Sequence, residues 1–191
     1  MSVKIHESAI VHPTAVIGYS LPGEVEESTI IEAGVIIGAF CVIEAGAYLE
    51  ADVILAHHSV VGRGSRIGQR SQLVDAVRVA RHALIGPDCI IGGNIPDRTV
   101  IGPKVTMMGE MSHQYQDATL KWGEVDEVSP IIREGVVIAQ GAEIVGGIVI
   151  GKGSYIAAGE IVRSDVPAKT FIGSGKWRPL KSMRGLVRAR S

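Results

Sequence analysis

An aliphatic side chain returns at every sixth position over most of this chain. The longest series contains Ile31, Ile37, Ile43, Leu49, Leu55, Val61, Ile67, Leu73, Val79, Ile85 and Ile91. A second series contains Ile132, Ile138, Ile144, Ile150, Ile156 and Val162, and Val11 and Ile17 begin the pattern near the N-terminus. A period of six is neither the 3.6 of a helix nor the 2 of a strand. Each unit is therefore predicted to be one short strand followed by one turn.

Three units make one triangular coil, in which each aliphatic side chain points inward and stacks on its equivalent in the next coil. Two positions before each aliphatic lies a second inward site that accepts only small side chains: Val35, Cys41, Ala47, Val53, Ser59, Ser65, Ser71, Val77, Ala83 and Cys89. Cys41 and Cys89 are thus predicted to be packing residues rather than metal ligands or redox groups. The residue after the aliphatic is often glycine, which permits a positive φ or close packing at a corner. This pattern predicts an all-β fold, a left-handed parallel β-helix of hexapeptide repeats.

Two interruptions break the repeat. Between Ile91 and Ile101 the step is four residues longer than six, and Pro96-Asp97 predicts a modest bulge or loop there. The larger break lies between Met107 and Ile132, so we expect a β-helix domain over residues 1–168 with a loop inserted at 108–131. Long loops on a rigid scaffold are common places for function. A basic C-terminal extension, which could be helical, is expected over residues 169–191.

Charge limits the classes of partner. The 19 Lys and Arg residues nearly balance the 20 Asp and Glu residues, which gives a formal net charge of −1 and no general attraction for nucleic acid or anionic membranes. The start of the chain has no apolar signal segment, and no apolar run reaches the roughly 20 residues of a membrane helix. We expect a cytoplasmic protein that binds neither nucleic acid nor membranes. Asp52, Arg70 and Asp88 are each separated by one full coil and are predicted to form one column of alternating charge.

The repeat, together with the segment from Ile131 to Pro167, resembles the hexapeptide-repeat acyltransferases and is most similar to the galactoside, maltose and xenobiotic acetyltransferase branch. In that branch a loop carries a catalytic His shortly before a Pro-Ile element re-enters the coil. Ser112-His113-Gln114-Tyr115, followed by Pro130-Ile131-Ile132, has the same layout. The resemblance implies direct transfer of an acetyl group from acetyl-coenzyme A, at a site between neighbouring helices of a homotrimer.

His113 also fits the chemistry on physical grounds. An acceptor hydroxyl is a poor nucleophile near neutral pH, and an imidazole, with a reference pKa of about 6.5, can take its proton as attack begins. Glu110 could orient the imidazole, while Tyr115 and Trp122 are expected to shape the substrate pocket. An ordinary solvent-exposed loop His is the alternative.

The same resemblance implies that the pantetheine arm of coenzyme A lies near Gln140 and Ala158. Here Ala139 and Ala157 replace the usual glycines, and their backbone N–H groups could still serve the cofactor. The phosphates are expected to meet basic side chains, for which the candidates are Arg163, Lys176, Arg178 and Lys181. Arg178 fits best, because Ser174 to Arg178 corresponds to a turn that follows the last coil. A solvated terminus would also explain these charges.

Two other functions remain possible for this repeat. A γ-class carbonic anhydrase would hold zinc through three histidines, but His57 and His82 are not separated by a whole number of coils and are not expected to stack. We therefore expect no metal. A non-catalytic scaffold subunit is disfavoured by the loop that carries His113. The sequence leaves open the acceptor, the choice between O- and N-acetylation, and the length of the acyl chain.

Overall fold

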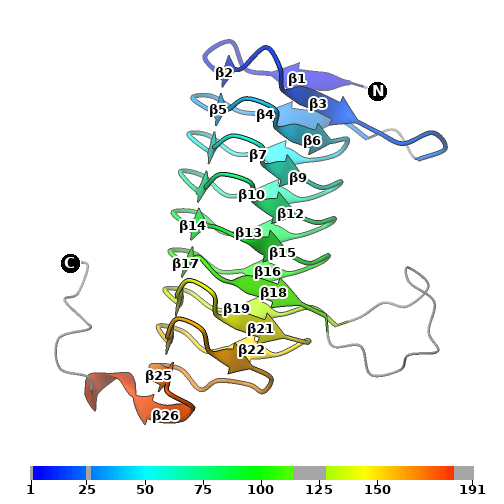
Figure 1. Cartoon of the computed structure of the whole chain (residues 1–191). Coiled ribbons are helices and arrows are strands. Elements are labelled where there is room, and N and C mark those ends of the chain that lie inside the picture. Colours follow the sequence, from blue (N-terminus) through cyan, green and yellow to red (C-terminus); the bar gives the residue numbers. More distant parts are fainter. Residues whose placement is uncertain (1, 25–26, 114–127, 183–191) are drawn as a thin grey trace.

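The computed structural model describes residues 2–24, 27–113 and 128–182, which form a three-sided solenoid of stacked coils (Figure 1). One side is sheet A: β1 (Val3–Ile5), β4 (Thr29–Ile31), β7 (Tyr48–Leu49), β10 (Arg66–Ile67), β13 (Leu84–Ile85), β16 (Val100–Ile101), β19 (Ile131–Ile132) and β22 (Val149–Ile150). The predicted fold class, a left-handed parallel β-helix, is confirmed.

Sheet B forms the second side and consists of β2 (Ile10–Val11), β5 (Ile36–Ile37), β8 (Ile54–Leu55), β11 (Gln72–Leu73), β14 (Ile90–Ile91), β17 (Thr106–Met107), β20 (Val137–Ile138), β23 (Tyr155–Ile156), β25 (Thr170–Gly173) and β26 (Lys176–Pro179). The third face contains two sheets, β3 (Val16–Tyr19), β6 (Val42–Glu44), β9 (Val60–Val61), β12 (Arg78–Val79) and β15 (Asn94–Ile95), then β18 (Glu110–Ser112), β21 (Glu143–Val145) and β24 (Ile161–Val162). Within the described residues no helix is long and apolar enough to cross a bilayer.

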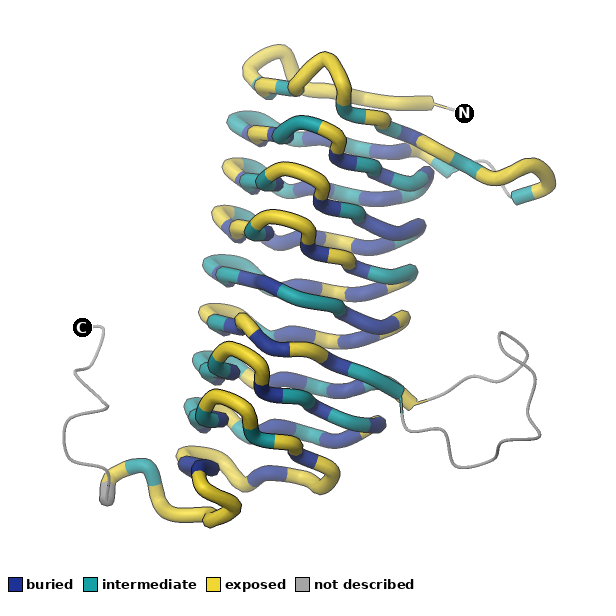
Figure 2. The backbone as a smooth tube through the Cα atoms, viewed as in Figure 1, coloured by how far each residue is buried: buried dark blue, intermediate teal, exposed yellow. Residues whose placement is uncertain are grey.

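The inward aliphatic series forms the core. Ile67 pairs in parallel register with Leu49 above it and Ile85 below it, each one coil away, and all three are buried. The second inward site is buried as predicted, and its serines donate to backbone carbonyls of the next coil, as Ser65 Oγ does to Ala80 O at 2.7 Å. Cys41 and Cys89 are fully buried, and burial raises the pKa of both thiols, which confirms them as packing residues. Figure 2 shows this buried lining in every coil but the first.

Most of the glycines that directly follow the aliphatic serve their corners by close packing and not by a positive φ. Residues in the left-handed region lie three positions after the aliphatic, and several are not glycine, as at Asp52 (φ 60°) and Arg70 (φ 60°). Gly68, which directly follows Ile67, has no positive φ, but a Cβ there would lie 2.5 Å from Gly86 C and Pro87 N. A side chain at this position would therefore collide with the backbone of the next coil.

The predicted bulge at Pro96-Asp97 is wrong. Gly92 and Gly93 alone connect β14 to β15, so Ile95 takes the next inward position only four residues after Ile91. This coil is two positions shorter than a regular coil, because Leu84 pairs with Val100 and not with Gly102. The irregular step from Ile91 to Ile101 in the sequence is therefore one shortened unit, which ends at Ile95, followed by one ordinary unit of six residues.

The long insertion also begins later than the sequence suggests. Glu110–Ser112 is β18, a regular strand that pairs with β21, so the repeat continues past Met108 as far as Ser112. At the other end of the chain, β25 continues sheet B beside β23 and turns back into β26 through Ser174 and Gly175. The basic extension thus begins as a hairpin, and its only described helical part is the 3₁₀ turn η1 (Leu180–Ser182).

The predicted charge column is confirmed. Arg70 Nε lies 2.7 Å from Asp88 Oδ1 and Arg70 Nη2 lies 3.0 Å from Asp88 Oδ2, one coil apart. This bidentate hydrogen bond lowers the pKa of Asp88 and raises the pKa of Arg70. The negative charge of Asp52, in the preceding coil, raises the pKa of Arg70 further. The register deduced from the length of one coil is therefore correct between Leu49 and Ile91.

Gly68→Ala tests the close packing of the corners. We expect the free energy of unfolding to fall by about 1–3 kcal/mol, because the new methyl group must displace the backbone at Gly86 and Pro87. Denaturant unfolding measures the change. Gln72→Ala, on the exposed side of β11, is the control and should leave stability within about 0.5 kcal/mol. Equal stability of both variants would contradict this packing.

Candidate functional site

Both insertions leave the solenoid at the same corner. We call this the third corner; it follows the third face and contains Arg63, Arg81, Asp97 and His113 in four successive coils. The first insertion, residues 20–28, we call the arm; it lengthens the first coil, so that β1 pairs with β4 across the whole insertion. The second insertion follows β18. Figure 1 shows the ends of β3 and β18, which these insertions follow, on the same side of the molecule.

The arm is fixed to the third corner by one carboxylate. Glu24 Oε2 lies 2.8 Å from Arg63 Nη2, and Glu24 Oε1 lies 3.0 Å from Arg81 Nη2. Arg63 also donates to Ser20 Oγ at 2.9 Å, and its side chain is only 8% exposed. Hydrogen bonds from the Leu21 backbone N–H and from Arg63 lower the pKa of Glu24. The arm therefore runs from the first coil down to the coils of Arg63 and Arg81.

His113 lies at the end of a well-anchored strand. Ser112, the last residue of β18, donates from Oγ to Glu143 Oε1 at 2.8 Å, and its carbonyl accepts a hydrogen bond from Gly146 N at 2.8 Å. The His113 side chain is half-buried, in the part of the third corner where β18 ends. Two hydrogen bonds to the next coil therefore hold Ser112, the residue directly before His113.

The predicted role of Glu110 finds no support in its hydrogen bonding. Glu110 Oε2 accepts from Asn94 N at 2.8 Å, at the start of β18 rather than at the end that carries His113. The acidic side chain bonded beside His113 is instead Glu143, through Ser112. Sequence reasoning missed Glu143 because the insertion hides which residue of the next coil lies opposite Ser112. Tyr115 and Trp122 lie outside the described residues.

The predicted pantetheine contacts lie on a different corner. Gln140 and Ala158 follow β20 and β23, so they occupy equivalent exposed positions of successive coils on what we call the second corner, which follows sheet B. The N–H groups of Ala139 and Ala157 donate to Ile156 O and Ile172 O, both at 2.9 Å or less. These two N–H groups are therefore part of the ladder and are not available to a cofactor, contrary to the expectation from sequence.

The basic candidates are exposed and lie near the last coils. Lys176 and Arg178 are on β26, Lys181 is in η1, and Arg163 follows β24 on the third corner. Arg178 pairs with Phe171 across the terminal hairpin. Within one chain, the second corner and His113 lie at opposite ends of the strands of the third face. A single chain therefore does not bring His113 together with Gln140 and Ala158.

Two histidines considered for zinc lie on separate corners. His57 is on the second corner, where its Nδ1 accepts a hydrogen bond from Ala39 N at 2.9 Å. His82 is on the third corner, where its backbone N–H donates to Arg63 O. The prediction that they do not stack is confirmed. Over the described ranges no group of three or more His, Cys, Asp and Glu side chains is placed to hold a metal ion.

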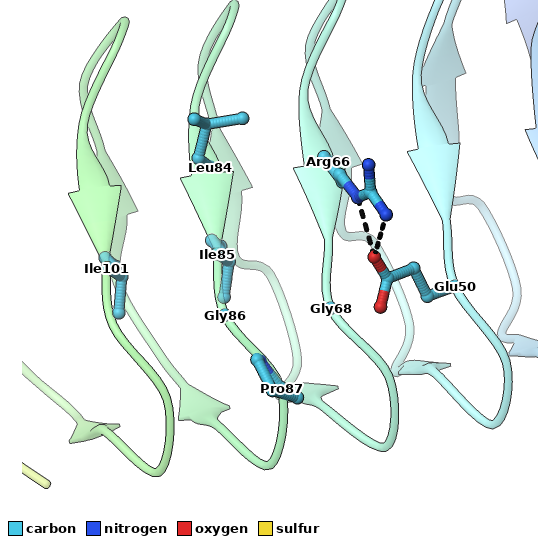
Figure 3. Close-up of a pocket in the computed structure, with 8 residues that line it drawn as sticks. All are labelled: Glu50, Arg66, Gly68, Leu84, Ile85, Gly86, Pro87 and Ile101. Carbon is cyan, nitrogen blue, oxygen red and sulfur yellow. Dashed lines mark hydrogen bonds and ion pairs between the residues drawn. The ribbon is translucent and has the colours of Figure 1, made fainter. Parts of the chain in front are cut away.

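A shallow depression of about 240 Å³ lies on sheet A (Figure 3). Gly68, Leu84 and Gly86 are among the residues that line it. Arg66 and Glu50 also line it, and Arg66 Nε donates to Glu50 Oε1 at 2.6 Å. None of the residues predicted for the site lines this depression.

Residues 28–63 match the family described as bacterial transferase hexapeptide (six repeats). This segment is therefore a hexapeptide repeat of that family, within a chain whose fold is built from the same repeat. The matched segment includes β4 to β9, in which the repeat has no interruption. The matched segment does not include His113 or the sequence around it, so the match does not test the suggested branch of the family.

Several solved structures are similar to this hexapeptide-repeat protein. PerB from Caulobacter crescentus, in complex with CoA and GDP-perosamine, is 18% identical over 93% of this chain and 57% of PerB, with a TM-score of 0.35. Serine acetyltransferase from Neisseria gonorrhoeae is 22% identical over 72% of this chain and 39% of that enzyme (TM-score 0.32). This chain thus spans less than two thirds of the length of either protein. A hexapeptide-repeat acetyltransferase from Vibrio cholerae O1 biovar eltor, complexed with acetyl coenzyme A, is 23% identical over 64% and 69% (TM-score 0.31). A search of curated proteins found no match.

Proposed function

We propose that this hexapeptide-repeat protein is an acyltransferase that moves an acetyl group from acetyl-coenzyme A to a hydroxyl or amino group of a small, sugar-like acceptor. The main support is the match of its repeats to bacterial transferases, combined with a histidine at the end of an anchored strand where an insertion leaves the coil. Anchoring favours catalysis because a base must be held within hydrogen-bond reach of the proton that it removes.

In the proposed reaction, His113 acts as a general base. An imidazole nitrogen takes the proton of the acceptor while the acceptor oxygen or nitrogen attacks the carbonyl carbon of the acetyl thioester. The carbon–sulfur bond breaks, coenzyme A leaves as a thiolate, and the imidazolium returns the proton to that sulfur. No acyl-enzyme forms, and no metal is needed.

We also propose that the active enzyme is a homotrimer. The candidates for cofactor binding on the second corner and His113 on the third corner are separated within one chain, so a complete site requires a second copy. A closed threefold ring gives every chain one such neighbour on each side. The phosphates of coenzyme A would meet the basic group of Arg163, Lys176, Arg178 and Lys181 near the last coils.

Replacement of the proposed base should affect turnover and not cofactor affinity. His113→Ala is expected to lower kcat by about 10²–10⁴, with little change in coenzyme A binding, because proton transfer belongs to the transition state. A panel of sugars, sugar nucleotides, alcohols and amines, with release of free thiol as the readout, first identifies the acceptor. His12→Ala, an exposed histidine of the first coil, is the control. A His113→Ala enzyme with more than about half of the normal kcat would remove His113 from the mechanism.

The phosphate contacts can be tested without an acceptor. Arg178→Ala should weaken coenzyme A binding several-fold, since charge-assisted hydrogen bonds to phosphate are strong. Calorimetry with coenzyme A measures this change. Arg78→Ala removes a similarly exposed arginine from β12 and should leave the affinity unchanged. An unaltered affinity of Arg178→Ala would exclude this residue from the cofactor site.

The trimer predicts a particular mass in solution. Sedimentation should give a species of three times the 20.2 kDa mass of one chain. A single species at the monomer mass under assay conditions would contradict both the trimer and a site shared between chains.

A further inference from the structure

The arm and His113 share the third corner, and only one coil separates the arm's attachment from the coil of His113. Arg81, which holds Glu24, lies two coils above His113, and Asp97 lies in the coil between them. Neighbouring strands in a sheet are about 4.8 Å apart, so Arg81 and His113 are about 10 Å apart along the solenoid. That interval accommodates one sugar ring laid over the corner at Asp97.

Hydrogen bonds connect the arm to the coil next to His113. Arg81 pairs with Glu24 through its side chain, and its backbone N–H donates to Asp97 Oδ1 at 2.6 Å. The carbonyl of Asp97 in turn accepts a hydrogen bond from Ser129 Oγ, where the second insertion returns to the coil. The positions of the arm, of Asp97 and of the returning chain are therefore fixed relative to one another.

The arm is held more firmly than a simple connection between β3 and β4 requires. The guanidinium of Arg63 is nearly buried and donates to both Ser20 and Glu24, and its backbone N–H donates to Glu44 Oε2 at 2.9 Å. Burying a charged side chain is costly unless it is paired, and the pair fixes one geometry. The part of the arm from Ser20 to Glu24 is thus kept in one position at the corner that carries His113.

We infer that the arm is the acceptor-recognition element of the proposed acetyltransferase, and that Glu24 and Arg81 bind a neutral, hydroxyl-rich acceptor beside His113. The Arg81 side chain is 44% exposed and pairs with the carboxylates of Glu24 and Glu44, while the carboxylate of Asp97 accepts a hydrogen bond from the Arg81 backbone N–H. A sugar hydroxyl both donates and accepts hydrogen bonds, so it can pair with the carboxylates and with the guanidinium. The three carboxylates disfavour an acceptor with its own negative charge at this point. The inference rests on the proposed function, because it assigns His113 to the reacting end of the acceptor.

The kinetic test separates recognition of the acceptor from the other steps. Glu24→Gln and, separately, Arg81→Gln should raise KM for the acceptor at least about tenfold, since each removes a charged hydrogen-bond partner. KM for acetyl-coenzyme A and kcat should stay within about twofold of the wild-type values. Arg70→Gln is the matched control, because it breaks an ion pair of the same kind with Asp88 on the corner that follows sheet A. An unchanged KM for the acceptor in both arm variants would overturn the inference and leave the proposed activity standing.

A binding measurement gives an answer that does not depend on turnover. Galactose and N-acetylglucosamine, titrated separately into the wild-type protein, should move the backbone amide signals of Glu24, Arg81 and Asp97 in heteronuclear NMR spectra, and Glu24→Gln should abolish these shifts. Such shifts without any acetyl transfer would support the recognition site and refute the proposed function. Shifts confined to other residues, or no shifts with either sugar, would overturn the inference.

Discussion

The structure depends on one repeated constraint, the stacking of an inward aliphatic side chain on its equivalent in the next coil while the backbone of each strand pairs with the strands above and below. Ile67 shows both, since it is buried between Leu49 and Ile85 and its strand pairs with each of theirs. Parallel pairing satisfies the backbone groups, and stacking removes the apolar surface from water. Very short strands are sufficient because every coil repeats the same contacts.

The corners are free of this constraint and carry the variation. The turn residues that precede the second inward site contribute no inward side chain, so a chain can leave and return there without disturbing the stack. Both insertions use this freedom at the third corner, and the ion pairs of Glu24 with Arg63 and Arg81 show that at least one of them is fixed in place. The proposed base thus combines a rigid anchor, Ser112 on Glu143, with surroundings that the repeat does not dictate.

The regular backbone hydrogen bonding between coils is interrupted in the coil before the long insertion. Pro96 has no N–H to give to Met111 O, and the side-chain amide of Asn94 donates there instead at 3.3 Å, while Asn94 N turns to Glu110 Oε2. Side chains therefore replace backbone bonds between β15 and β18, and the third face is split into two sheets. The stack itself continues, because Ile95 and Met111 remain buried in their inward positions.

The period of six determined the fold, the core and the burial of Cys41 and Cys89, because each depends only on spacing within the repeat. The length of one coil likewise placed Arg70 against Asp88, since a regular coil converts sequence distance into position. Predictions made from residue spacing were wrong where the length of a coil changes. The shortened corner at Gly92 and Gly93 was mistaken for a loop, and the partner of Ser112 could not be found across an insertion of unknown register. Only the tertiary structure set Glu143 beside Ser112, brought the arm onto Arg63 and Arg81, and separated Gln140 from His113. These relations join residues through space at corners and insertions, where no periodic contact links their positions in the sequence.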